Sequence, residues 1–172
     1  MIQVGKPAPE FEAEAVSNGS FSRISLGDFK GKWLVLFFWP LDFTFVCPTE
    51  VTAFSKRLAE FEALNAAVVG ASTDSKFTHL AWIDRIGEIK YPMVSDITKD
   101  ISRMYGVLVE EEGIALRGLF IIDPEGILRY QVVHDLSVGR SVDETLRVLK
   151  ALQTGELCPV DWEEGTPTLG SA

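Results

Sequence analysis

Hydrophobic side chains form unbroken runs in some segments of the chain and recur at helical spacing in others. Residues 33–39 are apolar without interruption, which is typical of a central strand covered on both faces. Between Val51 and Leu64 apolar side chains recur three or four positions apart, with charged residues between them. That spacing predicts a single amphipathic helix of about four turns.

The same patterns continue along the rest of the chain. Further segments predict strands at 66–72, 118–123 and 127–134, and helices at 75–86 and 98–105. An Asp-Pro-Glu-Gly turn separates the last two strands, so we expect them to pair antiparallel. Ser141 and Glu144 have capping-box spacing at the start of a final helix, which Gly155 should end.

Strands and helices therefore alternate first, and a strand pair and a closing helix follow. This order predicts an α/β fold with a mixed central sheet and helices on both faces. The thioredoxin-like fold has this order, and so do other α/β proteins. The sequence has no repeat or linker, so we expect one domain over residues 1–172, with an irregular tail at 154–172.

Net charge and hydropathy argue against nucleic-acid binding and against a membrane-spanning helix. The chain has 16 basic and 25 acidic residues and a formal net charge of −9. An acidic surface repels phosphate backbones, so we expect no nucleic-acid partner. The longest apolar run, residues 33–40, is far too short for a membrane-spanning helix. The first residues lack the pattern of a leader, which favours a cytoplasmic location.

Cysteines and histidines are few. Cys47 and Cys158 are the only cysteines, and His79 and His134 are the only histidines. Two cysteines are too few for a disulfide scaffold, and the spacing of these residues does not suit a metal site. We therefore expect no metal. His79 follows helical spacing, so we expect a partly buried helix residue there.

Cys47 lies where the buried strand at 33–39 gives way to the amphipathic helix. Proteins of the α/β class place their sites at this edge of the sheet. We expect either Thr44 or Cys47 to cap the helix, and Pro48 suits its first turn. On both assignments the sulfur lies near free backbone amides and the positive end of the helix dipole, which favour the thiolate.

A thiolate alone does not make an enzyme. Ionising the sulfur increases the reactive species only about 30-fold, whereas enzymes need ~10⁶-fold or more. Other groups must hold the electrophile, and the hydroxyl of Thr44 and the guanidinium of Arg117 are the candidates. A lone cysteine is more often structural, but polar neighbours such as Thr49 and Glu50 favour a reactive Cys47.

Cys158 lies in the tail, beyond the last predicted helix. An accessible thiol there could attack a sulfenic acid formed on Cys47 and close a disulfide. It could equally be an unpaired surface thiol. The residues alone leave both interpretations open.

From about Val4 to Trp162 the sequence resembles the peroxiredoxins. The resemblance is to the typical two-cysteine group, which includes the peroxide-reducing component of bacterial alkyl hydroperoxide reductase. Four segments carry it: Pro-x-x-x-Thr-x-x-Cys at 40–47, Leu-Arg-Gly-Leu-Phe-Ile-Ile-Asp-Pro at 116–124, Val-Gly-Arg-Ser-Val-Asp-Glu at 138–144, and Leu-Cys-Pro at 157–159. The first of these is a specific pattern.

The resemblance implies a thiol-dependent peroxidase for hydrogen peroxide and small alkyl hydroperoxides, with no metal, flavin or haem. Cys47 would attack the O–O bond and become a sulfenic acid. Thr44 and Arg117 would orient the peroxide and stabilise charge. Pro40 would shield the pocket from water, and Glu50 would orient the arginine.

The resemblance also implies protein partners. Cys158 of a partner subunit would condense with the sulfenic acid to give an intersubunit disulfide, after the first turn of the helix unwinds. The family forms homodimers, often five in a ring, so we expect a homodimer and a decamer. Thioredoxin or a dedicated disulfide reductase would restore the thiols.

Two other functions stay open at this stage. A thioredoxin-like thiol–disulfide reductase normally has a second cysteine three positions after the first. Glu50 occupies that position here, which counts against this function. A non-enzymatic holdase or ring scaffold would not need Cys47 at all.

Overall fold

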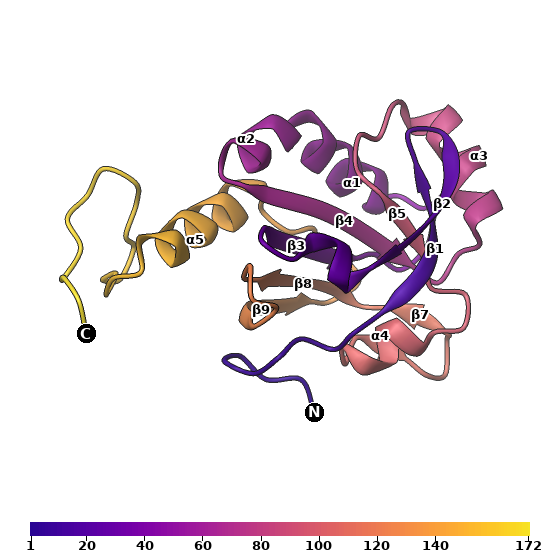
Figure 1. Ribbon diagram of the computed structural model, residues 1–172. Coiled ribbons are helices and arrows are strands. Elements are labelled where there is room, and N and C mark those ends of the chain that lie inside the picture. Colours follow the sequence, from indigo (N-terminus) through magenta and orange to yellow (C-terminus); the bar gives the residue numbers. More distant parts are fainter. The chain divides into compact units, whose positions relative to one another are not determined.

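Strands make up the centre of residues 1–140, and the computed structural model describes residues 1–172 in full. The strands are β1 (Glu12–Ser17), β2 (Ser20–Ser25), β3 (Trp33–Phe38), β4 (Ala66–Ser72), β5 (Met93–Ser95), β6 (Leu108–Val109), β7 (Ile114–Ala115), β8 (Arg117–Ile122) and β9 (Leu128–His134). Seven of them form one sheet in the order β2-β1-β5-β4-β3-β8-β9 (Figure 1). β3 pairs in parallel with β4 and antiparallel with β8, so the sheet is mixed, as predicted.

Helices cover both faces of this sheet. They are α1 (Cys47–Lys56), α2 (Leu58–Ala63), α3 (Lys76–Ile86) and α4 (Asp100–Met104). A fifth helix, α5 (Val142–Thr154), belongs to the second unit and is not counted among them. Phe37 of β3 stacks on Phe54 of α1, with 4.5 Å between the ring centroids. Phe38 points to the other face, where its ring lies 5.6 Å from that of Tyr105, directly after α4. In Figure 1, α1 and α2 accordingly lie on the side of the sheet opposite α4.

The predicted helix between Val51 and Leu64 is wrong in one respect, because it is two helices. α1 ends at Lys56 and α2 begins at Leu58; Arg57 between them has φ −105° and ψ 12°. The apolar side chains keep their spacing across this break, since one face stays buried in both helices. Hydrophobic periodicity reports the buried face and not the continuity of the backbone hydrogen bonds.

Several strands have no counterpart in the predicted elements. β2 has no buried residue, and β5 has only three residues. Neither offers the apolar run on which strand prediction depends; β1, β6 and β7 are missed as well. Asn18 and Gly19 link β1 to β2 with φ values of 49° and 72°, the left-handed pair that favours Asn-Gly in a tight hairpin.

Residues 141–172 form a second compact unit. The Ser141 side chain accepts a hydrogen bond from the backbone N–H of Glu144, and Gly155 ends α5 with a φ of 66°. Both helix boundaries are as predicted. The tail after Gly155 has no helix or strand, and backbone hydrogen bonds join Leu157 to Leu169 and Gly170. The single domain expected over residues 1–172 stays a prediction.

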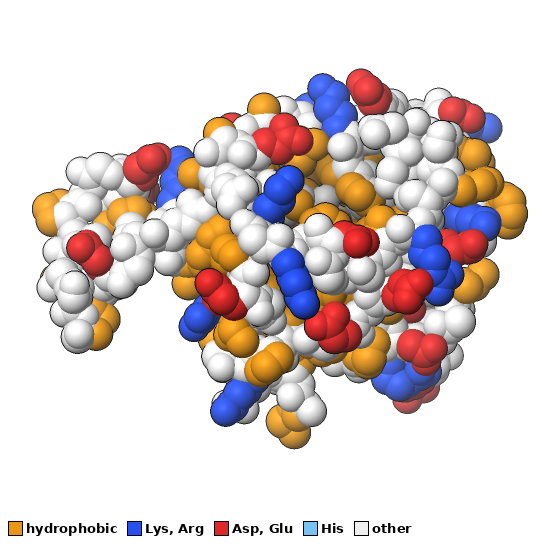
Figure 2. All heavy atoms as spheres, in the orientation of Figure 1, with side chains coloured by type: hydrophobic (Ala, Val, Ile, Leu, Met, Phe, Trp, Pro, Cys, Tyr) orange, Lys and Arg blue, Asp and Glu red, His pale blue; other side chains and the backbone are white.

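Charged side chains of both signs share the surface. Figure 2 shows acidic and basic groups interspersed over the face drawn there. The longest helix, α5, has 13 residues, and none of the helices combines the length and hydropathy that a membrane span requires.

Gly70 of β4 lies where two buried aromatic rings leave no room for a side chain. A Cβ there would be 2.5 Å from Cζ3 of Trp39 and 3.2 Å from Cε1 of Phe37. We expect Gly70→Ala to lower the free energy of unfolding by about 1–3 kcal/mol, because the rings must shift. Urea unfolding measures this loss. Gly27→Ala is the control, since its Cβ would meet only Ser25 Oγ, at 3.6 Å; equal stability of the two variants would contradict the prediction.

Candidate active site

Cys47 is the first residue of α1, and the loop at 39–46 leads to it from β3. Its side chain has no exposed surface. The helix cap is Val46, which makes no side-chain capping bond, so the expectation of Thr44 or Cys47 as the cap is wrong. Thr44 lies two residues before the cap, and its hydroxyl contacts the backbone oxygen of Leu41 and the sulfur of Cys47. The predicted position of the sulfur at the positive end of the helix dipole is unaffected.

Thr44 and Arg117 both reach the sulfur. Thr44 Oγ1 lies 3.0 Å from Cys47 Sγ, and Arg117 Nη1 lies 3.3 Å from it. Arg117 begins β8, which pairs antiparallel with β3; the start of β8 therefore lies beside the end of β3, where the loop to Cys47 begins. Thr44 Oγ1 also lies 2.9 Å from the backbone oxygen of Leu41, so its single proton has two acceptors within reach, that oxygen and the sulfur. The cationic donor Arg117 stabilises negative charge on the sulfur, and so does the hydroxyl when its proton is directed there.

Glu50 lies one turn after Cys47 on the same side of α1. Its Oε1 accepts a hydrogen bond from Arg117 Nη1 at 2.7 Å. Arg140 binds the same carboxylate from the other side, with Nε 2.7 Å from Oε2 and Nη2 3.0 Å from Oε1. All three side chains are at most 4% exposed. One buried carboxylate thus holds two guanidinium groups.

We call Cys47, Thr44, Glu50, Arg117 and Arg140 the Cys47 cluster. Burial alone would raise the pKa of Glu50, but the hydrogen bonds and charge of Arg140, with the charge of Arg117, hold that pKa below its ordinary value. Burial lowers the pKa of Arg140, and Glu50 counteracts this effect. Two guanidinium cations and one carboxylate leave an excess of one positive charge beside the sulfur.

Both arginines are fixed by further contacts before any substrate binds. Arg117 Nε donates to the backbone oxygen of Leu136 at 2.7 Å. Arg140 Nη1 donates to the backbone oxygen of Gly118 at 2.6 Å, and its guanidinium lies 5.3 Å from the centre of the Phe37 ring. Donors held in this way need no reorganisation when charge develops during a reaction.

Arg140 is the residue of the cluster that the sequence does not predict. It lies 90 positions from Glu50, and no local pattern connects the two. The one sequence feature that could point to Arg140 is the Val-Gly-Arg segment at 138–140, which is part of the family resemblance. That segment does not indicate which carboxylate the arginine binds.

Pro40 and Cys158 complete the predicted residues. Pro40 is buried at the start of the loop to Cys47, and its shielding role stays a prediction. Cys158 belongs to the unit of residues 141–172, where its half-buried Sγ lies 3.5 Å from Thr154 Oγ1 and 3.7 Å from the backbone oxygen of Ala151. Its pairing with Cys47 also stays a prediction.

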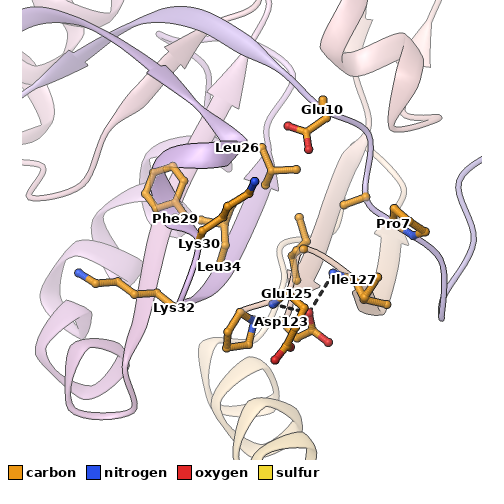
Figure 3. A pocket seen from close by; sticks show the side chains of 14 residues that line it. Pro7, Glu10, Leu26, Phe29, Lys30, Lys32, Leu34, Asp123, Glu125 and Ile127 are labelled. Carbon is orange, nitrogen blue, oxygen red and sulfur yellow. Dashed lines mark hydrogen bonds between the residues drawn. The ribbon is translucent and has the colours of Figure 1, made fainter.

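A separate cavity of about 160 Å³ lies at the other end of β3, beside Leu34. Figure 3 shows its Asp123, whose carboxylate accepts hydrogen bonds from the backbone N–H groups of Glu125 and Ile127. That carboxylate therefore stabilises a turn. No residue of the Cys47 cluster lines the cavity, so it is not the reaction site.

A buried sulfur that faces a hydroxyl and a guanidinium, on an α/β sheet of thioredoxin-like order, defines a thiol-based redox enzyme. Residues 4–131 match the AhpC/TSA family. Peroxiredoxin-2 of Bos taurus is 55% identical over 176 residues, covering 96% of this chain and 88% of that protein. The mitochondrial thioredoxin-dependent peroxide reductase of Drosophila melanogaster is 55% identical over 171 residues, covering 94% of this chain and 73% of that protein.

A solved structure agrees with these sequence relatives. The reduced 2-Cys peroxiredoxin of Plasmodium vivax matches with a TM-score of 0.94 at 45% identity, covering 97% of this chain and 92% of that chain. The chain therefore belongs to the AhpC/TSA family, among the peroxiredoxins. It is a thiol peroxidase, and the predicted thioredoxin-like fold and oxidoreductase class are confirmed.

Glu50→Gln should strongly destabilise the protein. The amide keeps the shape of the side chain but leaves two buried guanidinium groups without their anion. We expect a loss of about 3 kcal/mol in the free energy of unfolding, as for other buried pairs that lose one partner. Urea unfolding at neutral pH measures it. The control is Glu110→Gln, which removes an exposed ion pair with Arg103 and should change stability little.

Glu50→Gln should also change how the free energy of unfolding depends on pH. Because the pKa of Glu50 is lowered on folding, its contribution is complete above its unfolded pKa of about 4.3 and is lost as the pH falls through the folded pKa. The unfolding free energy of the wild type should therefore fall more steeply with acidification than that of Glu50→Gln. Equal slopes below about pH 4.3 would contradict an ionised Glu50.

Proposed function

We propose that Cys47 is the sulfur that attacks hydrogen peroxide and small alkyl hydroperoxides. The thiolate forms an S–O bond with one peroxide oxygen while the O–O bond breaks. The other oxygen leaves with the electron pair of that bond, takes a proton and departs as water or an alcohol. The sulfur is oxidised to a sulfenic acid. The contacts of Thr44 Oγ1 and Arg117 Nη1 with Sγ, at 3.0 and 3.3 Å, carry this assignment.

Each neighbour of the sulfur has a role in this step. Thr44 and Arg117 bind the two peroxide oxygens and stabilise the charge that develops on the leaving oxygen. Glu50 holds Arg117 in position through the 2.7 Å contact and is held in turn by Arg140. Pro40 shields the site from water. The complete burial of Cys47 favours small peroxides as substrates.

Cys158 of a partner subunit then resolves the sulfenic acid. Its thiolate attacks the Cys47 sulfur, the S–O bond breaks, and water leaves as the intersubunit disulfide forms. Because Cys47 has no exposed surface, the first turn of α1 must open before this attack. Two electrons from a reductant return both residues to thiols, so the cycle needs no metal, flavin or haem.

Thioredoxin or a dedicated disulfide reductase is the proposed electron donor. The name of the relative from Drosophila melanogaster, a thioredoxin-dependent peroxide reductase, supports the first of these. A cytoplasmic location fits a cycle that depends on thiols being restored.

A homodimer, assembled into a ring of five, is the proposed oligomer. β9 is an edge strand of the sheet, and an open edge is a template for pairing with a second copy. Val133 on that strand is 45% exposed. Light scattering of the reduced protein should give the mass of a dimer or of a decamer, and the mass of a single chain would contradict the proposal.

Cys158→Ser tests the proposed cycle. The variant should consume one equivalent of peroxide per chain and then stop, because its sulfenic acid has no resolving thiol. On a non-reducing gel after stoichiometric peroxide, the wild type should show a dimer-sized band that the variant lacks. Cys47→Ser is the control and should show neither consumption nor the band. A dimer-sized band from Cys158→Ser would contradict the assignment.

A further inference from the structure

Asp42 and His79 form a buried pair outside the Cys47 cluster. His79 Nδ1 lies 2.6 Å from Asp42 Oδ2, and neither side chain has exposed surface, so the expectation of a partly buried His79 is wrong. His79 Nε2 lies 2.9 Å from the backbone oxygen of Val94 in β5. Trp39 Nε1 donates to the other oxygen of Asp42 at 2.8 Å. Asp42, a loop residue, is thereby linked to α3 through His79 and to the end of β3 through Trp39. His79 continues the link to β5.

These contacts require a shared proton. The backbone oxygen of Val94 can only accept, so His79 Nε2 carries a hydrogen. Nδ1 faces a carboxylate oxygen, so a second hydrogen lies between His79 and Asp42. Burial raises the pKa of Asp42. Burial lowers the pKa of His79, but the hydrogen bond and charge of Asp42 outweigh that effect and raise it.

Asp74 is the other titratable group that faces the pair. Its Oδ2 accepts hydrogen bonds from the backbone N–H of Asp42 at 2.9 Å and from Ser72 Oγ at 2.5 Å. Its negative charge favours retention of the shared proton. Asp42, Asp74 and His79 have a spacing that could hold a metal ion, but such an ion would have to displace the hydrogen bonds that already engage both nitrogens of His79.

The loop held by this pair contains a strained residue. Phe43, between Asp42 and Thr44, has a φ of 58°, in the left-handed region that is unfavourable for a residue with a side chain. Such residues persist where their surroundings hold them and are concentrated at functional sites. The Phe43 ring is 54% exposed, and its centre lies 6.4 Å from that of the Trp82 ring in α3. The contacts of Asp42 on one side and of Thr44 on the other fix the backbone around Phe43.

We propose that Asp42 and His79 are positioning residues of the peroxidase, which direct the Thr44 hydroxyl at the Cys47 sulfur. Asp42 lies two residues before Thr44, and Thr44 Oγ1 is 2.9 Å from the backbone oxygen of Leu41 and 3.0 Å from the sulfur. Without the pair, Phe43 relaxes to an ordinary φ and the hydroxyl turns away. This inference rests on the proposed role of Cys47 and Thr44, and it adds residues that touch neither peroxide nor sulfur.

Two substitutions of Asp42 separate positioning from simple charge. In Asp42→Asn the carbonyl oxygen still accepts from Trp39, and the amide donates to Nδ1 of a neutral His79, so the loop stays in place without the shared proton. Asp42→Ala loses both contacts. We expect kcat/KM for hydrogen peroxide to fall about 100-fold in Asp42→Ala and only about threefold in Asp42→Asn. Equal losses in the two variants would overturn the proposal.

The pH profile gives a second readout. As pH rises, the native pair loses its shared proton, the Nδ1 lone pair then faces a carboxylate, and the loop is released. Wild-type kcat/KM should therefore fall on the alkaline side of its profile, and that fall should be absent in Asp42→Asn. If kcat/KM fell with the same midpoint pH in the wild type and in Asp42→Asn, the proposed role of the shared proton would be contradicted.

A double-mutant cycle with Thr44→Val tests whether Asp42 affects kcat/KM through the Thr44 hydroxyl. If Asp42 acts through the Thr44 hydroxyl, Asp42→Ala should cost no more than about twofold once that hydroxyl is gone. Additive losses would show a general effect on the fold and overturn the proposal. Should Asp42→Ala fail to give a cooperative thermal transition, Trp39→Phe replaces it in the same cycle, because it removes one donor to Asp42.

Peroxide consumption by Cys47→Ser distinguishes failure of the proposed function from failure of this inference. If Cys47 were not the reacting sulfur, Cys47→Ser would consume peroxide as fast as the parent. If only the inference were wrong, Cys47→Ser would be inactive while the Asp42→Ala and Thr44→Val losses added.

Discussion

Cys47→Ser is expected to reduce peroxide consumption to the uncatalysed background, a loss of more than about 1,000-fold. A serine hydroxyl is not ionised near neutral pH, even beside Thr44 and Arg117, and it cannot be oxidised to a sulfenic acid. Peroxide consumption with dithiothreitol as the reductant measures this loss without assuming a particular protein partner. Far-ultraviolet circular dichroism should show an unchanged fold, since the two side chains differ by one atom.

The two alternative functions predict other outcomes for the same variant. A holdase or scaffold would keep its principal activity in Cys47→Ser. A thioredoxin-like reductase would reduce insulin disulfides and consume little peroxide. Glu50 stands where such a reductase has its second cysteine, and it binds Arg117 and Arg140 there. Substantial peroxidase activity in Cys47→Ser would contradict the account.

Arg117→Met should lower kcat/KM for hydrogen peroxide by about 100- to 1,000-fold, the usual cost of removing a fixed donor to a developing oxyanion. The variant keeps an unbranched chain but loses the Nη1 contact with Cys47 Sγ at 3.3 Å. It also leaves Glu50 bound by Arg140 alone. Stopped-flow measurement of peroxide reduction gives the rate of this step directly.

Arg129→Met is the matched control. Arg129 forms an ion pair with Asp123, its side chain is 45% exposed, and it has no contact with the Cys47 cluster. We expect kcat/KM to change less than twofold there. Arg117→Lys separates charge from geometry, because an ammonium cannot contact Cys47, Glu50 and Leu136 in one plane. Arg117→Met activity within tenfold of the wild type would exclude Arg117 from the reacting step.

The sequence alone is enough to predict the parts of the site that are local. Thr44 lies in the loop that follows the most apolar strand, and Cys47 begins α1 three positions later, so their proximity depends on that short segment only. Arg117 could be named because it begins a second buried strand. Its contact with the sulfur depends on the pairing of β3 with β8, which the order of elements suggests but does not prove.

The remaining parts depend on tertiary contacts that leave no local pattern. Arg140 reaches Glu50 across 90 positions, and His79 reaches Asp42 across 37. The cap at Val46 and the break at Arg57 are backbone features. Hydrophobic spacing is insensitive to such features because it records only which face is buried.

Trapping the oxidised sulfur tests the central claim most directly. Reduced Cys158→Ser protein is mixed with one equivalent of hydrogen peroxide and excess dimedone, and the peptide that contains Cys47 is weighed by mass spectrometry. The account predicts one dimedone adduct per chain at Cys47, with all of the peroxide consumed. An unmodified Cys47 thiol, with the peroxide remaining in solution, would contradict it.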